Sequence, residues 1–285
     1  MPPVVSKAAL SPVALVLLSI LSTQVGAAIA KPLFLELSPP GVVLLRLGFG
    51  ALMLMLWKRP DWGRYSAQEY RLLVLFGLSI AAMNGFFYGA IARIPIGIAV
   101  TVEFLGPLGI ALLKSRRRLD LLWVALAGAG VLLLSPTPGS ALDPLGLVYA
   151  LIAAVGWGSY ILLSAKAGES FIGADILPIV MTVAAIALLP SGLITGGAAL
   201  GSPRLWALCA LVGFLSSVVT YTLEMAALKR MAVNVFGVLL SWEPAIASLL
   251  GFVMLGEVLS GRSILAIGLV SLAAAGSAQG EVARV

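Results

Sequence analysis

The sequence predicts an all-α polytopic membrane protein, with ten transmembrane helices arranged as two inverted five-helix repeats. Three observations predict this fold class: the composition, the spacing of the apolar segments, and a short stretch that occurs twice. Of the 285 residues, 61% are hydrophobic and 11% are charged, whereas a soluble domain carries about 25% charged residues. One soluble core of this length cannot bury so many apolar side chains, so the chain must place them in a bilayer.

Ten apolar segments are each close to the roughly 20 residues that a helix needs to cross a bilayer. The expected spans are 12–31, 40–57, 70–92, 95–113, 119–135, 145–165, 174–195, 204–227, 232–255 and 262–280. The first segment follows Lys7 and ends in small residues, as a cleavable signal peptide does. Its length, with Thr23 and Gln24 near its end, favours a retained first helix.

The distribution of Lys and Arg predicts the orientation. With a cytoplasmic N-terminus and ten spans, 13 of the 18 Lys and Arg residues fall in cytoplasmic segments, four fall outside, and Arg46 lies within a span. The positive-inside rule therefore places both termini in the cytoplasm. The net charge of +6 lies in short loops and sets topology, so no nucleic-acid partner is expected.

The stretch Met83–Pro107, MNGFFYGAIARIPIGIAVTVEFLGP, has a diluted copy in Ala227–Pro244. In both copies an Ala-x-x-Arg motif is followed fourteen residues later by proline. The alternative is a chance similarity between two apolar helices that end in proline. A five-span repeat must insert with opposite orientations in its two copies, as in many secondary transporters. We therefore expect repeats at 1–137 and 138–285, with a binding site between them near the midplane.

Glu103 is the carboxylate expected deepest in the bilayer. It lies near the middle of the span 95–113 and shares a helix face with Ala99 and Gly106. Small residues let another helix approach closely, so Glu103 is expected to point into the bundle. A buried membrane carboxylate is a functional hypothesis by default. Proton or ammonium binding, and a structural salt bridge or a protonated carboxyl, remain alternatives.

Three other charged residues lie more than two residues inside the ends of the predicted spans. Glu243 precedes Pro244 and is expected to be structural at the repeat interface. Glu224 ends a polar stripe, which either lines an aqueous path or marks the cytoplasmic end of its span. Arg46 has three alternatives: snorkelling to the outer surface, pairing with Glu36, or binding a substrate carboxylate.

Several polar and aromatic side chains complete the candidate set. Gln24 and Asn84 are costly to bury, so they are expected to meet each other, the backbone or a ligand. Aromatic residues in spans are more often packing residues or interface anchors than ligand contacts. The candidates of this kind are Tyr88, Trp157 and Tyr160.

The sequence also excludes several kinds of chemistry. It has no histidine, which removes histidine-based metal sites, Ser-His triads and histidine proton switches. It contains no GxxxxGK[ST] motif, so ATP hydrolysis is not expected. The aspartates fall in loops or at helix ends, which argues against intramembrane proteolysis. We therefore expect no enzyme, no metal and no cofactor.

Seven stretches resemble the drug/metabolite transporter superfamily in its EamA-type branch, and within it the bacterial threonine/homoserine exporters. They are Gln24–Pro32, Gly41–Gly50, Met83–Tyr88, Pro95–Pro107, Ser115–Arg117, Ser241–Pro244 and Leu255–Glu257. The resemblance covers most of the chain, and Gly97–Pro107 with Ser241–Pro244 are its most specific parts.

The resemblance implies a bacterial inner-membrane exporter of small amino acids, driven by the proton gradient and working as a monomer or homodimer. The implied partners are an amino-acid substrate, protons and the lipid bilayer. A cavity lined by the polar and aromatic candidates would then hold a zwitterion, with Arg46 on its carboxylate and Glu103 on its ammonium group. Glu103 is also the expected proton-coupling group. The alternatives are another exported metabolite or drug, and a membrane assembly subunit without transport activity.

Overall fold

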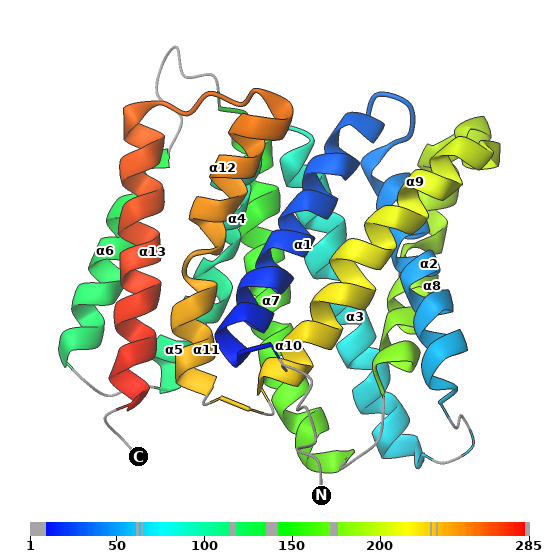
Figure 1. Ribbon diagram of the computed structural model, residues 1–285, viewed down its shortest axis with the longest axis horizontal. Helices are drawn as coiled ribbons and strands as arrows, with labels where there is room; N and C mark the ends of the chain where they lie inside the picture. Colours follow the sequence, from blue (N-terminus) through cyan, green and yellow to red (C-terminus); the bar gives the residue numbers. More distant parts are fainter. Residues whose placement is uncertain are drawn as a thin grey trace, which may run out of the picture.

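The computed structural model describes residues 10–60, 63, 65–114, 118–134, 142–171, 176–228, 230–231 and 233–282. Within these ranges the regular elements are helices (Figure 1). In chain order they are α1 (Pro12–Leu33), α2 (Pro39–Lys58), α3 (Ala67–Ile91), α4 (Ile96–Glu103), α5 (Leu105–Lys114), α6 (Arg118–Leu134), α7 (Pro144–Ser170), α8 (Leu177–Gly196), the 3-10 helix Gly197–Gly201, α9 (Pro203–Gly213), the π-helix Phe214–Val219, α10 (Thr220–Leu228), α11 (Val233–Leu240), α12 (Glu243–Leu255) and α13 (Gly261–Val282).

Every predicted span contains apolar helix within the described ranges. Seven helical segments there are long and apolar enough to cross a membrane. Three shorter apolar helices, Ile96–Ile110, Ala125–Leu134 and Gly261–Gly276, occupy the remaining spans. The prediction of an α-helical multi-pass membrane protein is therefore confirmed. The predicted repeat boundary at residue 137 and the motif at Ser115–Arg117 lie outside the described residues.

Two spans are broken near their middles, each just before a proline. The span expected to be continuous over 95–113 is instead α4 and α5, separated at Phe104. The span 232–255 is α11 and α12, separated at Ser241 and Trp242. Proline lacks an amide hydrogen and clashes with the carbonyl four residues earlier. Pro107 and Pro244 therefore disturb the backbone near the last residue of the preceding helix in each case.

A third span departs from regular α-helix without a proline. Between α9 and α10, Phe214–Val219 forms a π-helical segment, seen within the continuous yellow rod of Figure 1. A π-turn places one additional residue in the turn, and such turns inside α-helices are frequent at functional sites. The backbone here therefore offers carbonyl groups in positions that an α-helix would not.

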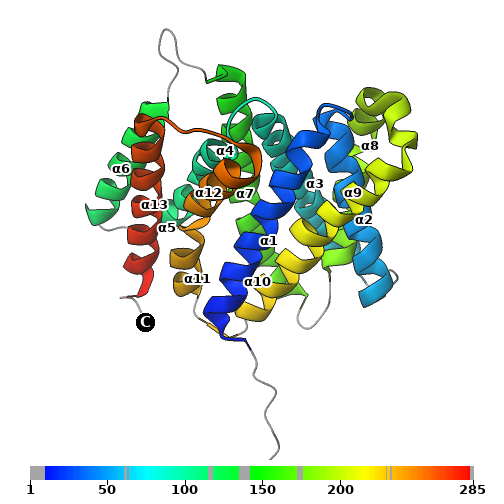
Figure 2. The same cartoon turned by 45° about the horizontal axis from the view of Figure 1, so that its top comes forward.

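Helices from the beginning and the end of the chain pack against one another throughout the bundle. The helix α3 packs on α7, α2 on α8, α6 on α13, α4 on α12, and α1 on the rod formed by α9, the π-helix and α10. Figures 1 and 2 both show α6 and α13 at one side of the bundle and α2 with α8 at the other. The middle of the bundle is formed by α1, α3, α4, α7, α10 and α12.

The start of α7 is fixed by a polar contact outside the spans. Asp143 caps the helix by accepting a hydrogen bond from the amide of Leu145 (2.8 Å). It also accepts one from Nη1 of Arg93 (2.9 Å). This hydrogen bond from the guanidinium lowers the pKa of the Asp143 carboxyl from its usual value. The turn between α3 and α4 is thereby tied to the first turn of α7.

Candidate functional site

Arg46 of α2 is the centre of a buried polar cluster. Only 4% of this residue is exposed. Its Nη1 donates to Oδ1 of Asn84 on α3 (2.6 Å), and its Nη2 donates to the carbonyl of Ser216 in the π-helix (3.1 Å). The guanidinium carbon lies 5.1 Å from the centroid of the Tyr88 ring, within the range of a cation–π interaction.

This geometry excludes two of the three alternatives for Arg46. The side chain does not snorkel to the surface, because it is buried among three helices. It does not pair with Glu36, whose carboxylate instead meets Arg204 at the surface (2.6 Å). Asn84 and Gln24 do not pair with each other: Asn84 bonds Arg46 and, through its amide nitrogen, the carbonyl of Ile80 (2.9 Å).

The π-helix supplies the acceptors that hold this cluster together. The carbonyl of Leu215 accepts hydrogen bonds from Ser22 (2.8 Å) and Thr220 (2.9 Å). The hydroxyl of Thr220 also lies 2.6 Å from that of Thr23 on α1. The irregular backbone thus joins α1 and α10 by polar contacts, as expected where non-helical backbone at membrane depth must be satisfied internally.

Two glycines allow α1 and α2 to reach the π-helix. A Cβ atom on Gly26 of α1 would overlap the hydroxyl of Ser216. A Cβ atom on Gly50 of α2 would lie 3.0 Å from Cβ of Ser217. Ser216 and Ser22 are not singled out by the sequence analysis. Their only signal in the sequence is a pair of serines inside an apolar run, which does not indicate a π-turn.

Glu243 and Glu103 lie next to this cluster, at the two helix breaks. Glu243 is the first residue of α12, and its Oε1 accepts a hydrogen bond from Nε2 of Gln24 (3.0 Å). Glu103 is the last residue of α4 and is 8% exposed. Glu103 interacts electrostatically with both Glu243 and Arg46. Two acidic groups and one basic group are therefore brought together from three helices.

The remaining candidates extend the cluster along α7 and α10. Glu224 is half-buried and interacts electrostatically with Glu243 and Tyr160. The rings of Tyr160 and Tyr221 are 6.4 Å apart. The Trp157 ring meets Phe104 edge-on at 5.4 Å, directly beside Glu103 in the chain. The structure thus links Glu224 and Tyr160 to the polar cluster, whereas Trp157 packs against Phe104, Val270 and Ala274 in an apolar cluster.

Several polar atoms in the cluster have no protein partner. Within the described part of the chain, Oε1 of Gln24, Nε of Arg46, the hydroxyl of Tyr88 and the hydroxyl of Ser217 are buried and make no hydrogen bond to protein. Most buried polar groups in folded proteins are hydrogen-bonded. The four atoms include donors and acceptors, a combination suited to a small polar ligand.

A second set of polar contacts, around Lys31 and Glu257, lies at one end of the cluster. Lys31, at the end of α1, donates to Oε1 of Glu257 (2.6 Å) and to the carbonyl of Ile94 (2.8 Å). The other oxygen of Glu257 accepts from the amide of Ile96 (2.9 Å). Gly256 ends α12 with φ of +68°, a conformation that favours glycine. This Lys31–Glu257 cluster joins α1, the α3–α4 turn and the end of α12.

Comparison with known proteins places the chain in a family. Residues 144–278 match the model of the EamA-like transporter family. Over 269 residues the chain is 41% identical to the threonine/homoserine exporter RhtA of Salmonella typhimurium (strain LT2), covering 93% of this chain and 90% of the relative. The chain belongs to the EamA-like transporter family. The family resemblance predicted from the sequence motifs is therefore confirmed.

Other proteins are similar to this chain over most of its length. The RhtA exporter of Escherichia coli K12 is 40% identical with the same coverage. Protein PecM of Dickeya dadantii is 26% identical over 212 residues, or 70% of each chain. A crystal structure at 18% identity superposes with a TM-score of 0.62 and covers 96% of this chain and 97% of its own, so it shares the fold.

Proposed function

We propose that this EamA-family protein exports small amino acids, threonine and homoserine among them, from the cytoplasm by proton-coupled alternating access. The observation that carries the proposal is the buried pair Arg46 and Glu103, which interact electrostatically, with Glu243 beside Glu103. An amino-acid zwitterion has the complementary charges, with its carboxylate suited to Arg46 and its ammonium group to the glutamates. The identity to the RhtA exporters over most of the chain supports the same substrate class.

The packing supports inverted repeats at 1–137 and 138–285. If span six is equivalent to span one, α7 corresponds to α1 and the α9–α10 rod corresponds to α3. The contact of α1 with the α9–α10 rod then has its counterpart in the contact of α7 with α3. Under the same rule α2 pairs with its equivalent α8, and α6 with its equivalent α13. When Pro107 is aligned with Pro244, α4 and α11 end at equivalent positions. Broken helices in corresponding positions of two repeats are typical of secondary transporters.

The two ends of the cluster differ in their exposure, which suggests an access state. At the Lys31 end, Tyr88, Ile94 and Ile96 are each 1% exposed. At the other end, Glu224 and Tyr160 are half-buried. With cytoplasmic termini, the Lys31 end faces outward, so this conformation is closed outside and accessible from the cytoplasm.

The proposed function is tested by counterflow with radiolabelled threonine and homoserine in proteoliposomes. Purified protein is expected to exchange both amino acids, and unlabelled homoserine is expected to compete with labelled threonine. Empty liposomes and excess unlabelled lysine serve as controls. Absence of exchange for every small amino acid tested, in protein that remains folded, would contradict the proposed substrate class.

Lys31→Gln is expected to open the outer end. Hydrogen bonds to charged groups contribute roughly 1.5–3 kcal/mol each, so losing the bond to Glu257 should shift the access equilibrium at least about tenfold. The readout is labelling of a Ser217→Cys reporter, in a Cys209→Ala background, by an impermeant maleimide added outside. Arg204→Gln removes the exposed pair with Glu36 and is the matched control. Equal labelling in the two variants would contradict the proposed role of Lys31.

A further inference from the structure

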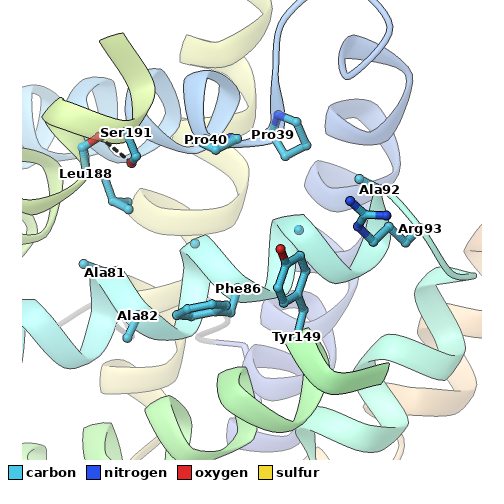
Figure 3. Close-up of a pocket in the computed structure, with 12 residues that line it drawn as sticks. Pro39, Pro40, Ala81, Ala82, Phe86, Ala92, Arg93, Tyr149, Leu188 and Ser191 are labelled. Carbon is cyan, nitrogen blue, oxygen red and sulfur yellow. Dashed lines mark hydrogen bonds between the residues drawn. The ribbon is translucent and has the colours of Figure 1, made fainter. Parts of the chain in front are cut away.

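A groove lies on the flank of the bundle, separate from the polar cluster. It has a volume of about 690 Å³ and runs between α2 and α8 on one side and α3 and α7 on the other (Figure 3). Its lining is Pro39, Pro40, Ala81, Ala82, Gly85, Phe86, Gly89, Ala92, Arg93, Tyr149, Leu188 and Ser191. The four helices are membrane spans, so the groove opens towards lipid.

The groove is apolar along its length and cationic at one end. Its base on α3 is formed by small residues, among them Gly85 and Gly89, and its walls include Phe86 and Leu188. Figure 3 shows Arg93 and Tyr149 together at the end near Pro39. Arg93 follows the last turn of α3, at the depth where a spanning helix leaves the hydrocarbon. An apolar channel that ends at a guanidinium group is complementary to a phospholipid, which has apolar acyl chains and a negatively charged phosphate.

We propose that this groove binds one phospholipid, with an acyl chain along Ala82 and Gly85 and the phosphate on Arg93. The Arg93 guanidinium lies 5.7 Å from the ring centroid of Tyr149, and one of its nitrogens donates a hydrogen bond to Asp143. Its planar group carries five N–H donors, and guanidinium groups bind phosphate in a bidentate manner. The phosphate is common to anionic and zwitterionic headgroups. The Arg93 nitrogens that do not bond to Asp143 remain to bind this phosphate diester.

The site is independent of the transported substrate, but it adjoins the polar cluster. Gly85 directly follows Asn84, and Gly89 follows Tyr88 in the sequence. The bound chain therefore lies against one face of α3 while Asn84 and Tyr88 face Arg46 from another. The lipid would occupy the space between α3 and α8 that the small side chains leave.

Native mass spectrometry of the full chain tests the site by titration with phosphatidylglycerol and, separately, phosphatidylethanolamine. The native chain is expected to retain one lipid of either class. Gly85→Leu fills the groove, since its Cβ would already lie 3.2 Å from Leu188, and is expected to weaken retention about tenfold. Gly48→Leu is the control, because a Cβ atom there meets nothing within 4 Å.

Two further variants keep the test decisive. Ala82→Leu fills the same groove from a half-buried position and serves if Gly85→Leu does not fold. Arg93→Gln is expected to weaken retention of both headgroup classes by about the same factor, since it removes the phosphate contact but not the channel. Equal retention by the native chain, the groove-filling variants and Gly48→Leu would overturn the proposal, as would a lipid-free native chain.

Discussion

Arg46→Gln is expected to reduce threonine counterflow by about a hundredfold. The variant loses the charge proposed to hold the substrate carboxylate, and hydrogen bonds to charged groups contribute roughly 1.5–3 kcal/mol each. It also releases Asn84 and the Ser216 carbonyl, which Arg46 holds at 2.6 and 3.1 Å. Substrate contact and positioning of the site are therefore lost together. The measurement is initial counterflow rate in proteoliposomes with matched protein content.

Arg46→Lys separates charge from geometry. Lysine keeps the positive charge but cannot bridge two acceptors with a planar group, so it is expected to recover only part of the activity. Arg204→Gln, at an exposed position, is the control for a change of net charge and should exchange threonine normally. Thermal unfolding of each variant in detergent distinguishes a damaged site from an unfolded protein. Native-like counterflow by Arg46→Gln would rule out carboxylate binding at this residue.

Glu103→Gln is expected to abolish threonine transport driven by a pH gradient while leaving assembly intact. The amide cannot carry a proton between the two sides, and it cannot attract an ammonium group as a carboxylate does. Glu103 is 8% exposed and interacts with both Arg46 and Glu243, so its charge state acts directly on the site. The assay is gradient-driven threonine accumulation in inverted vesicles, with oligomer profile and thermal unfolding measured in parallel.

Glu243→Gln is the matched comparison for Glu103→Gln. It removes the other carboxylate and alters its hydrogen bond with Gln24 (3.0 Å). If Glu103 is the coupling group, Glu243→Gln should retain measurable gradient-driven transport when Glu103→Gln has none. The reverse order of activities would assign coupling to Glu243 instead. Full coupled transport by Glu103→Gln would show that Glu103 is not the coupling group.

The sequence predicted the spans well because hydrocarbon thickness fixes their length and composition. It also indicated that Glu103, Asn84 and Gln24 would face the interior, because their burial in lipid is too costly, but it left a surface position open for Arg46. The partners of these groups could not be predicted. Gln24 meets Glu243 across 219 positions of sequence, and such pairings depend on how helices pack.

The helix break at Phe104 and the π-turn were missed for different reasons. Pro107 signalled the break, but prolines are tolerated inside membrane helices when neighbours satisfy the backbone, so proline alone did not decide it. The π-turn has no proline or glycine within Phe214–Val219. Its stability depends on Ser22 and Arg46, which donate to its carbonyls from other helices.

The π-helical segment also sets the rotational phase of the eighth span. An α-helix advances about 100° per residue, whereas a turn with one additional residue advances less. A single helical wheel drawn from Pro203 to Leu228 therefore assigns α10 to the wrong angle relative to α9. Tyr221 faces Arg46 and Asn84 at the phase that the π-turn sets. The eighth span consequently needs two separate helical wheels, and deleting one residue within Phe214–Val219 would restore α-helical geometry while leaving Tyr221 and Glu224 close to their present directions.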